Sequence, residues 1–120
     1  MYNIQTLNKI AAVGTSKFDS SKYTVGDSVE NPEAIMVRSA KMHDMEFGSN
    51  LLAIARAGAG VNNIPVDKCA EAGICVFNTP GANANAVKEL AICAMLLSSR
   101  KITEAAAWAA SLKGTPDAPK

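Results

Sequence analysis

Short apolar runs, separated by polar and turn-forming residues, set the pattern of this chain of 120 residues. The runs are continuous rather than alternating, which is typical of strands that are covered on both faces, as in a parallel sheet. On this basis we expect five strands, at residues 8–14, 23–25, 34–37, 51–57 and 74–77.

Helical spacing appears in three other places. Residues 41–49 predict a short helical turn, and Pro65 suits the first position of a helix that Gly73 ends. A longer helical pattern runs from about residue 84 to 112, with a polar interruption at residues 98–101. Within it, residues 90–97 are apolar on all sides, so we expect them to be buried all round.

Strands that alternate with helices predict an α/β fold with a mostly parallel sheet. We expect residues 1–81 to form one domain and residues 82–120 to form a helix that leads into a second domain. The last residues, 113–120, contain one glycine and two prolines and are interpreted as a linker toward that domain.

Composition narrows the class of protein. The formal net charge is only +1 and the basic residues are spread along the chain, which argues against a nucleic-acid partner. No apolar run approaches the roughly 18 residues of a membrane-spanning helix, and the N-terminus lacks a signal-peptide pattern. The three cysteines have no CxxC spacing, so we expect reduced thiols and a cytoplasmic location, without a metal site.

Three of the expected strands end in residues with distinctive chemistry. Arg38 and Ser39 follow one strand, Gly58-Ala59-Gly60 follows the next, and residues 78–81 (Asn-Thr-Pro-Gly) follow the last. Ligands of open parallel sheets bind at the carboxyl ends of the strands. If the strands are parallel, these three ends lie on one edge and form the candidate site.

The glycine-containing loop resembles a dinucleotide fingerprint, GxGxxG, but departs from it. The third position is Asn63, Pro65 delays the following helix, and the acidic residue expected about 20 residues further on is missing. We therefore interpret Gly58, Ala59 and Gly60 as a loop whose backbone N–H groups can face a small anion. The alternative is a tight turn without a ligand.

Two arginines stand near the same edge. Arg38 follows an apolar run, and Arg56 lies inside one, where an unpaired guanidinium would be costly. Arginine binds carboxylates and phosphates through two parallel hydrogen bonds, which favours a small anionic ligand. The alternative for both arginines is a structural ion pair with a local carboxylate such as Asp67 or Glu71.

Complete catalytic machinery is not visible in this sequence. His43 is expected to be a surface histidine rather than a catalytic one, and no metal-ligand cluster appears. Asn83 or Asn85 is a candidate N-cap of the long helix, whose positive end would favour anions.

Three segments, IMVRSAK (35–41), LLAIARAGAGVNNIPVDKCAEAGICVFNTPGANANAVKELAI (51–92) and LLSSRKI (96–102), resemble the N-terminal part of phosphoglycerate dehydrogenases, in the D-2-hydroxyacid dehydrogenase family. The resemblance covers roughly residues 34–120. It implies a flavodoxin-like substrate domain of a two-domain, NAD-dependent oxidoreductase. Such enzymes oxidise 3-phosphoglycerate to 3-phosphohydroxypyruvate, the first committed step of serine synthesis.

The resemblance also implies roles for individual residues. Arg38 and Ser39 would help to bind the anionic substrate, and Arg56 would also serve its phosphate end. The amides of residues 58–60 would hold the carboxylate, and Asn83 would lie at the cleft between the domains. The family's catalytic histidine, glutamate and arginine, and its NAD fingerprint, belong to the nucleotide domain and have no counterpart here. This chain alone is therefore expected to be inactive.

Two expectations concern partners. The apolar residues of the 84–112 segment predict a homodimer or higher oligomer, because they would be exposed without a covering partner. Fold alone also allows a non-catalytic interaction module, since some members of the wider family act as corepressors.

Overall fold

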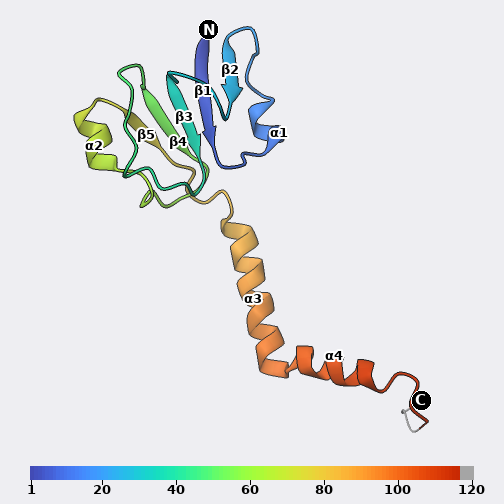
Figure 1. Cartoon of the computed structure of the whole chain (residues 1–120). Coiled ribbons are helices and arrows are strands. Elements are labelled where there is room, and N and C mark those ends of the chain that lie inside the picture. The colour runs from blue at the N-terminus through green and yellow to red at the C-terminus, as the bar shows by residue number, and fades with distance from the viewer. Residues whose placement is uncertain (117–120) are drawn as a thin grey trace. The chain divides into compact units, whose positions relative to one another are not determined.

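In a computed structural model, which describes residues 1–116, the chain divides into two compact units. The first runs from Met1 to Ala82 and holds a sheet with two short helices, while the second begins at Asn83 and holds two longer helices (Figure 1). The final residues, 117–120, which include part of the predicted linker, lie outside the described residues.

The first unit is built on one sheet of five parallel strands. In sequence order these are β1 (Tyr2–Leu7), β2 (Tyr23–Gly26), β3 (Ala34–Val37), β4 (Ala53–Arg56) and β5 (Cys75–Phe77). In space the order is β2-β1-β3-β4-β5, the flavodoxin-like arrangement. The predicted α/β fold with a parallel sheet is therefore confirmed.

The core lies mainly on one face of this sheet. Alternate residues of β3 and β4 are buried there, and the loop between β4 and β5 adds Ile64 and helix α2 (Val66–Glu71) with its buried Cys69. On the other face, Met36 and Ala55 are only half-buried. We expected both faces of the sheet to be covered, but only the face with the core holds the buried residues of β3 and β4, and the opposite face is partly exposed.

The first predicted strand was placed wrongly. Residues 8–14 are not a strand: β1 precedes them, and Ala12–Thr15 forms the short helix α1. Strand β1 alternates apolar with polar residues yet pairs with both β2 and β3, so backbone hydrogen bonding rather than an apolar run defines it. The apolar residues that follow are not core, since Val13 is 75% exposed.

The predicted helical turn at residues 41–49 is present only as one hydrogen-bonded turn, in which the N–H of Met45 donates to the Met42 carbonyl at 3.2 Å; the rest of this segment is an irregular loop. Its apolar residues are nevertheless used in packing. Met42 is fully buried in the core cluster, and Met45 and Phe47 pack against that cluster.

The second unit consists of α3 (Ala84–Arg100) and α4 (Ile102–Ser111). Between them Lys101 adopts a left-handed conformation with φ of 47°, which ends α3 at the polar interruption seen in the sequence. The expected burial of residues 90–97 is not found, since neither helix contains a buried residue. Among residues 1–116, no helix combines the length and the apolar character needed to cross a membrane.

Candidate functional site

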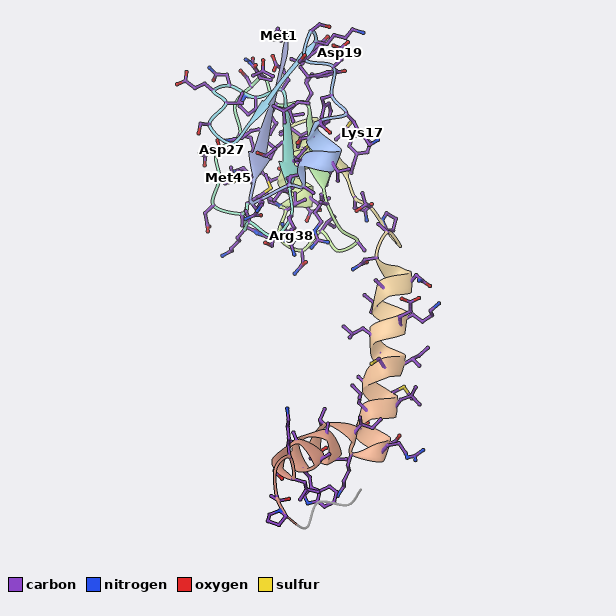
Figure 2. All side chains as sticks on the ribbon, turned by 90° about the vertical axis from the view of Figure 1, so that its right-hand side faces the viewer. Met1, Lys17, Asp19, Asp27, Arg38 and Met45 are labelled. Atoms are coloured by element: carbon purple, nitrogen blue, oxygen red, sulfur yellow. The ribbon has the colours of Figure 1, made fainter. Side chains whose placement is uncertain are left out.

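The carboxyl ends of the parallel strands bring the predicted site residues to one edge. Strand β3 leads directly into Arg38 and Ser39, and the neighbouring β4 ends at Arg56, ahead of the glycine loop. Arg38 lies at the opposite end of the sheet from Met1, which precedes the amino end of β1 (Figure 2). The prediction that these strand ends share one edge is confirmed by the parallel pairing of β3, β4 and β5.

Asn8 fixes the turn that carries Arg38, a role that the sequence did not reveal. It follows β1 in a left-handed conformation with φ of 69°, which asparagine adopts more readily than most residues. Its side-chain Oδ1 accepts hydrogen bonds from the backbone N–H groups of Ser39, at 2.8 Å, and Ala40, at 2.7 Å. The ends of β1 and β3 are thereby tied together.

Arg56 is half-buried and folds back over its own loop. Its Nε donates a hydrogen bond to the backbone carbonyl of Arg38, 3.1 Å away. The guanidinium also lies against Gly58, where an added Cβ would come within 2.7 Å of Cζ. Within residues 1–116 the ion pairs involve lysines only, so the alternative pairing of Arg56 with Asp67 or Glu71 is not found.

The glycine loop is held by β5 and its following residues. The N–H of Thr79 donates to the Gly58 carbonyl at 3.0 Å, and Asn78 Nδ2 donates to the Ala59 carbonyl at 2.8 Å. The N–H of Gly58 itself donates to the Arg56 carbonyl at 2.9 Å. In the described part of the chain, the N–H groups of Ala59 and Gly60 have no acceptor, which leaves them available to an anion.

Asn63, which stands where a dinucleotide fingerprint would have its third glycine, makes a structural contact through its side chain. Its Nδ2 donates to the Ala40 carbonyl at 2.9 Å, and its own carbonyl accepts from the N–H of Met42 at 2.8 Å. A glycine could not make the side-chain contact. Asn8 and Asn63 therefore hold the turn after β3 from two sides.

A hollow of about 480 Å³ opens at this edge, beside α1. Lys9 and Arg38 are the charged residues of its lining, together with apolar residues that include Met36 and Ala57. A lining with two cations and no carboxylate favours an anionic ligand.

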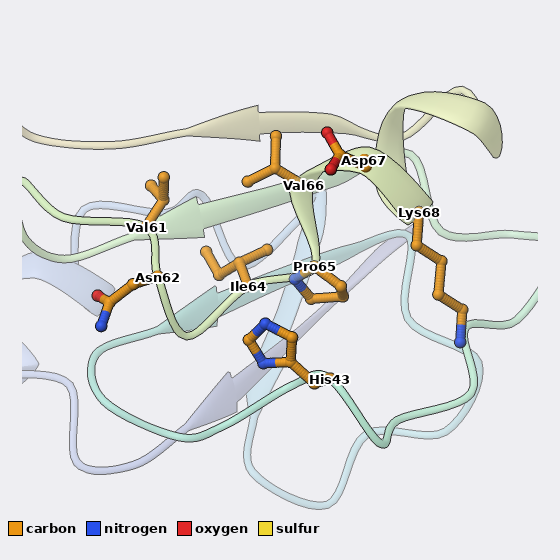
Figure 3. A pocket seen from close by; sticks show the side chains of 8 residues that line it. All are labelled: His43, Val61, Asn62, Ile64, Pro65, Val66, Asp67 and Lys68. Carbon is orange, nitrogen blue, oxygen red and sulfur yellow. The ribbon is translucent and has the colours of Figure 1, made fainter.

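A second hollow, of about 570 Å³, lies between the loop that holds His43 and the segment from Val61 to Lys68 (Figure 3). Asp67 and Lys68 give it both signs of charge. His43 makes no hydrogen bond or ion pair to another side chain within residues 1–116, so this hollow contains no histidine–carboxylate pair suited to proton transfer.

The glycine loop after β4, residues 58–60, does not fit the pyrophosphate of NAD. A dinucleotide loop opens directly into a helix whose N-terminus faces the phosphates, whereas α2 starts only at Val66 and has six residues. Among the described residues, no group of three or more histidine, cysteine or acidic side chains is placed to hold a metal ion.

Asn83 stands at the N-cap position of α3, but its side chain makes no capping hydrogen bond. Its backbone carbonyl accepts from the N–H of Val87 at 3.0 Å. Asn85 does not cap the helix either, because its side chain bonds to Glu89 and Lys88. Asn83 is therefore the N-cap residue, as predicted, although it caps through its backbone and not through its side chain, and its role in substrate binding remains a prediction.

Comparison with known proteins shows the family to which the chain is similar. The sequence pattern of the family described as "D-isomer specific 2-hydroxyacid dehydrogenase, catalytic domain" matches residues 2–114. A hydroxypyruvate reductase of Thermotoga maritima is 49% identical over 76 residues, which cover 61% of this chain and 25% of that protein. A D-3-phosphoglycerate dehydrogenase of Synechocystis sp. is 38% identical over 105 residues, which cover 85% of this chain and 19% of that protein.

Among solved structures, the NAD⁺-bound 3-phosphoglycerate dehydrogenase of Entamoeba histolytica superposes with a TM-score of 0.64 at 25% sequence identity. The match covers 80% of this chain and 38% of that chain. The present chain thus spans a quarter or less of the length of these two curated relatives. On its sequence pattern and its parallel sheet, the chain belongs to the family of D-isomer specific 2-hydroxyacid dehydrogenases.

Proposed function

We propose that this chain is the substrate-binding part of an NAD-dependent oxidoreductase that oxidises 3-phospho-D-glycerate to 3-phosphohydroxypyruvate, in the cytoplasm and in serine synthesis. The proposal rests on one observation: Arg56 donates a hydrogen bond to the Arg38 carbonyl, beside the N–H groups of Ala59 and Gly60, which have no acceptor among residues 1–116. Arginine guanidinium groups and backbone N–H donors suit a ligand that has a carboxylate and a phosphate.

Each group at this edge has a part in binding. The Ala59 and Gly60 amides hold the carboxylate of the substrate, and the guanidinium groups of Arg38 and Arg56 attract its anionic groups. The Ser39 hydroxyl is exposed at the same turn and adds a hydrogen bond, whereas its N–H is already bonded to Asn8. Arginine side chains and backbone N–H groups only donate hydrogen bonds, and the Ser39 hydroxyl is far too weak a base at neutral pH to take up the proton released when a 2-hydroxyacid is oxidised.

NAD and the proton-accepting residue therefore belong to a further part of the whole protein. The two relatives named above are four or more times as long as the segment matched here. When bound, NAD accepts the hydride from the substrate carbon. This chain contributes binding and orientation, and alone it should show no turnover.

The nature of the relatives leaves a second candidate substrate. The Thermotoga maritima relative is named a hydroxypyruvate reductase, which favours a smaller ligand without a phosphate. Both ligands carry a carboxylate next to an oxygen-bearing carbon, so the glycine loop suits either. The two ligands differ in charge, because 3-phosphoglycerate carries a phosphate and hydroxypyruvate does not.

Self-association is the second part of the proposal. Helices α3 and α4 expose large apolar side chains, with Leu90 at 71%, Met95 at 70% and Trp108 at 64% exposure. Exposed apolar surface of this kind favours association, and a second copy of the chain is the simplest partner. We propose a homo-oligomer that forms through these helices.

Calorimetry tests the proposed substrate. The unaltered chain is titrated with 3-phosphoglycerate and with hydroxypyruvate at millimolar concentrations, and the titrations are repeated on Arg56→Ala. We expect 3-phosphoglycerate to bind more tightly and Arg56→Ala to weaken it. An absence of binding by either ligand would instead favour a non-catalytic interaction module of the same fold, and NADH formation by this chain would contradict its expected inactivity.

A further inference from the structure

We propose that Lys9 is a second cation of the substrate site, that it binds a phosphate group together with Arg38, and that Asn8 positions both residues. This inference rests on the proposed function and adds a residue to it. It assigns the phosphate end of the ligand to the hollow between Lys9 and Arg38, and the carboxylate end to the glycine loop.

The strand register places the two cations next to each other. Strands β1 and β3 run parallel, with Leu7 paired to Val37 as the last step of the register. The next residues are Asn8 on one strand and Arg38 on the other, and Lys9 then follows Asn8. Both Lys9 and Arg38 line the hollow of about 480 Å³ at this edge.

Asn8 makes this arrangement rigid. Its Oδ1 accepts from two successive N–H groups, those of Ser39 and Ala40, in the turn that follows Arg38. Because Asn8 precedes Lys9 directly, the same two hydrogen bonds hold the backbone of Lys9 at a fixed distance from the backbone of Arg38. Asn8 touches no part of the proposed ligand and acts as a positioning residue.

The charges of the hollow are not neutralised within the described chain. No ion pair or side-chain hydrogen bond of Lys9 is found among residues 1–116, and the Arg38 side chain has none either. No acidic residue lines this hollow; Asp27 lines an adjoining hollow that Lys9 also borders, but it forms no ion pair with Lys9. Two unneutralised cations beside one opening attract a doubly charged group more strongly than a singly charged one.

The chemistry of the two cations fits a phosphate monoester. Arginine binds phosphate oxygens as a planar fork, and lysine binds them as a compact point charge. The apolar remainder of the lining, with Ile10, Val13 and Met36, offers no hydrogen-bonding side chain that would suit an uncharged hydroxyl group instead. The hollow is therefore assigned to the phosphate of a phosphorylated 2-hydroxyacid.

The test compares two ligands that differ only in the phosphate, 3-phosphoglycerate and D-glycerate. Affinities are measured by amide-shift titration of the whole ¹⁵N-labelled chain and of Lys9→Gln, Lys9→Arg, Arg38→Gln and Lys17→Gln. Lys17 is exposed and lies outside the hollow, so Lys17→Gln is the matched control for the change in charge. The amide spectrum of each variant also reports whether its fold is retained.

We expect Lys9→Gln to weaken 3-phosphoglycerate about two- to fivefold, as for one solvent-accessible ion pair, and to leave D-glycerate unchanged. Lys9→Arg should keep most of the affinity, and Lys17→Gln should change neither ligand. The inference is overturned if Lys9→Gln behaves like Lys17→Gln or weakens both ligands equally. If Arg38→Gln weakens binding while Lys9→Gln does not, the role of Lys9 fails alone; if the unaltered chain binds neither ligand, the proposed function fails with it.

Discussion

Replacing Gly58 with alanine probes the contact between the glycine loop and Arg56. Gly58 has a φ of +156°, which side chains other than glycine rarely adopt, and an added Cβ would lie 2.7 Å from Arg56 Cζ. Ordinary contact begins at 3.4 Å and Arg56 Nη1 would lie closer still than Cζ, so the guanidinium must withdraw by more than about 0.7 Å. A shift of this size breaks the 3.1 Å hydrogen bond to the Arg38 carbonyl unless the whole side chain turns with it.

The expected cost has two parts. The backbone conformation contributes about 1–3 kcal/mol, as for other sparsely populated conformations. Loss of the hydrogen bond from the half-buried Arg56 adds about 0.5–1.5 kcal/mol. We expect Gly58→Ala to lower the free energy of unfolding of the sheet unit by about 2–4 kcal/mol.

Urea unfolding, followed through the amide signals of the strands, measures this change. Gly60→Ala is the matched control in the same loop, because its Cβ would lie 3.5 Å from Asn62 Oδ1, an ordinary contact; its effect should stay within about 0.5 kcal/mol. In an Arg56→Ala background, Gly58→Ala should lose the part of its cost that comes from the guanidinium. Equal costs for the two glycines, or no coupling to Arg56, would refute the packing of Arg56 over Gly58.

Four further predictions concern other parts of the chain. Asn8→Ala should lower the free energy of unfolding in urea by about 1–2 kcal/mol more than Asn31→Ala does. Both asparagines have positive φ, but of the two only Asn8 accepts two hydrogen bonds from backbone N–H groups. Equal costs for the two substitutions would contradict the role of Asn8. Met42→Ala should cost about 2–5 kcal/mol in the same assay because Met42 is fully buried, and a neutral result would place it outside the core. Burial raises the pKa of the Cys69 thiol and shields it, so Ellman's reagent should label the exposed Cys75 but not Cys69 until the chain unfolds. Labelling of Cys69 as fast as Cys75 would be inconsistent with the buried site. Light scattering should detect an oligomer that Leu90→Glu and Met95→Glu weaken, whereas a monomer at high concentration would rule out association through α3.

Continuous apolar runs predicted three neighbouring strands of the sheet, β3, β4 and the edge strand β5. Strands β3, β4 and β5 lie within or close to their predicted ranges, because each is flanked by neighbouring strands or by core residues on one face. Strand β1 could not be found in this way, since its side chains alternate and its stability comes from pairing on both sides. The apolar residues after it were mistaken for core, although Val13 is largely exposed.

The candidate site was only partly visible in the sequence. Arg38, Arg56 and the glycine loop stand out because charge and small residues interrupt apolar runs. Asn8 and Lys9 do not stand out, because they look like ordinary polar loop residues, and only the β1–β3 register brings them to the edge. Among residues 1–116, the N–H of Gly58 donates to a carbonyl of the chain, whereas those of Ala59 and Gly60 do not. This difference depends on the geometry of the loop, which the spacing of residues in the sequence does not predict.

The most direct measurement is a map of amide-shift changes on titrating the ¹⁵N-labelled chain with 3-phosphoglycerate. We predict saturable shifts that are largest at Ala59 and Gly60, whose N–H groups lack an acceptor among residues 1–116, with smaller shifts around Lys9, Arg38 and Arg56. The shifts should diminish as salt is added, because the ligand is held by charges close to solvent. Saturable shifts confined to the His43 hollow, or no shifts at millimolar ligand, would contradict a substrate site at the carboxyl edge of this sheet.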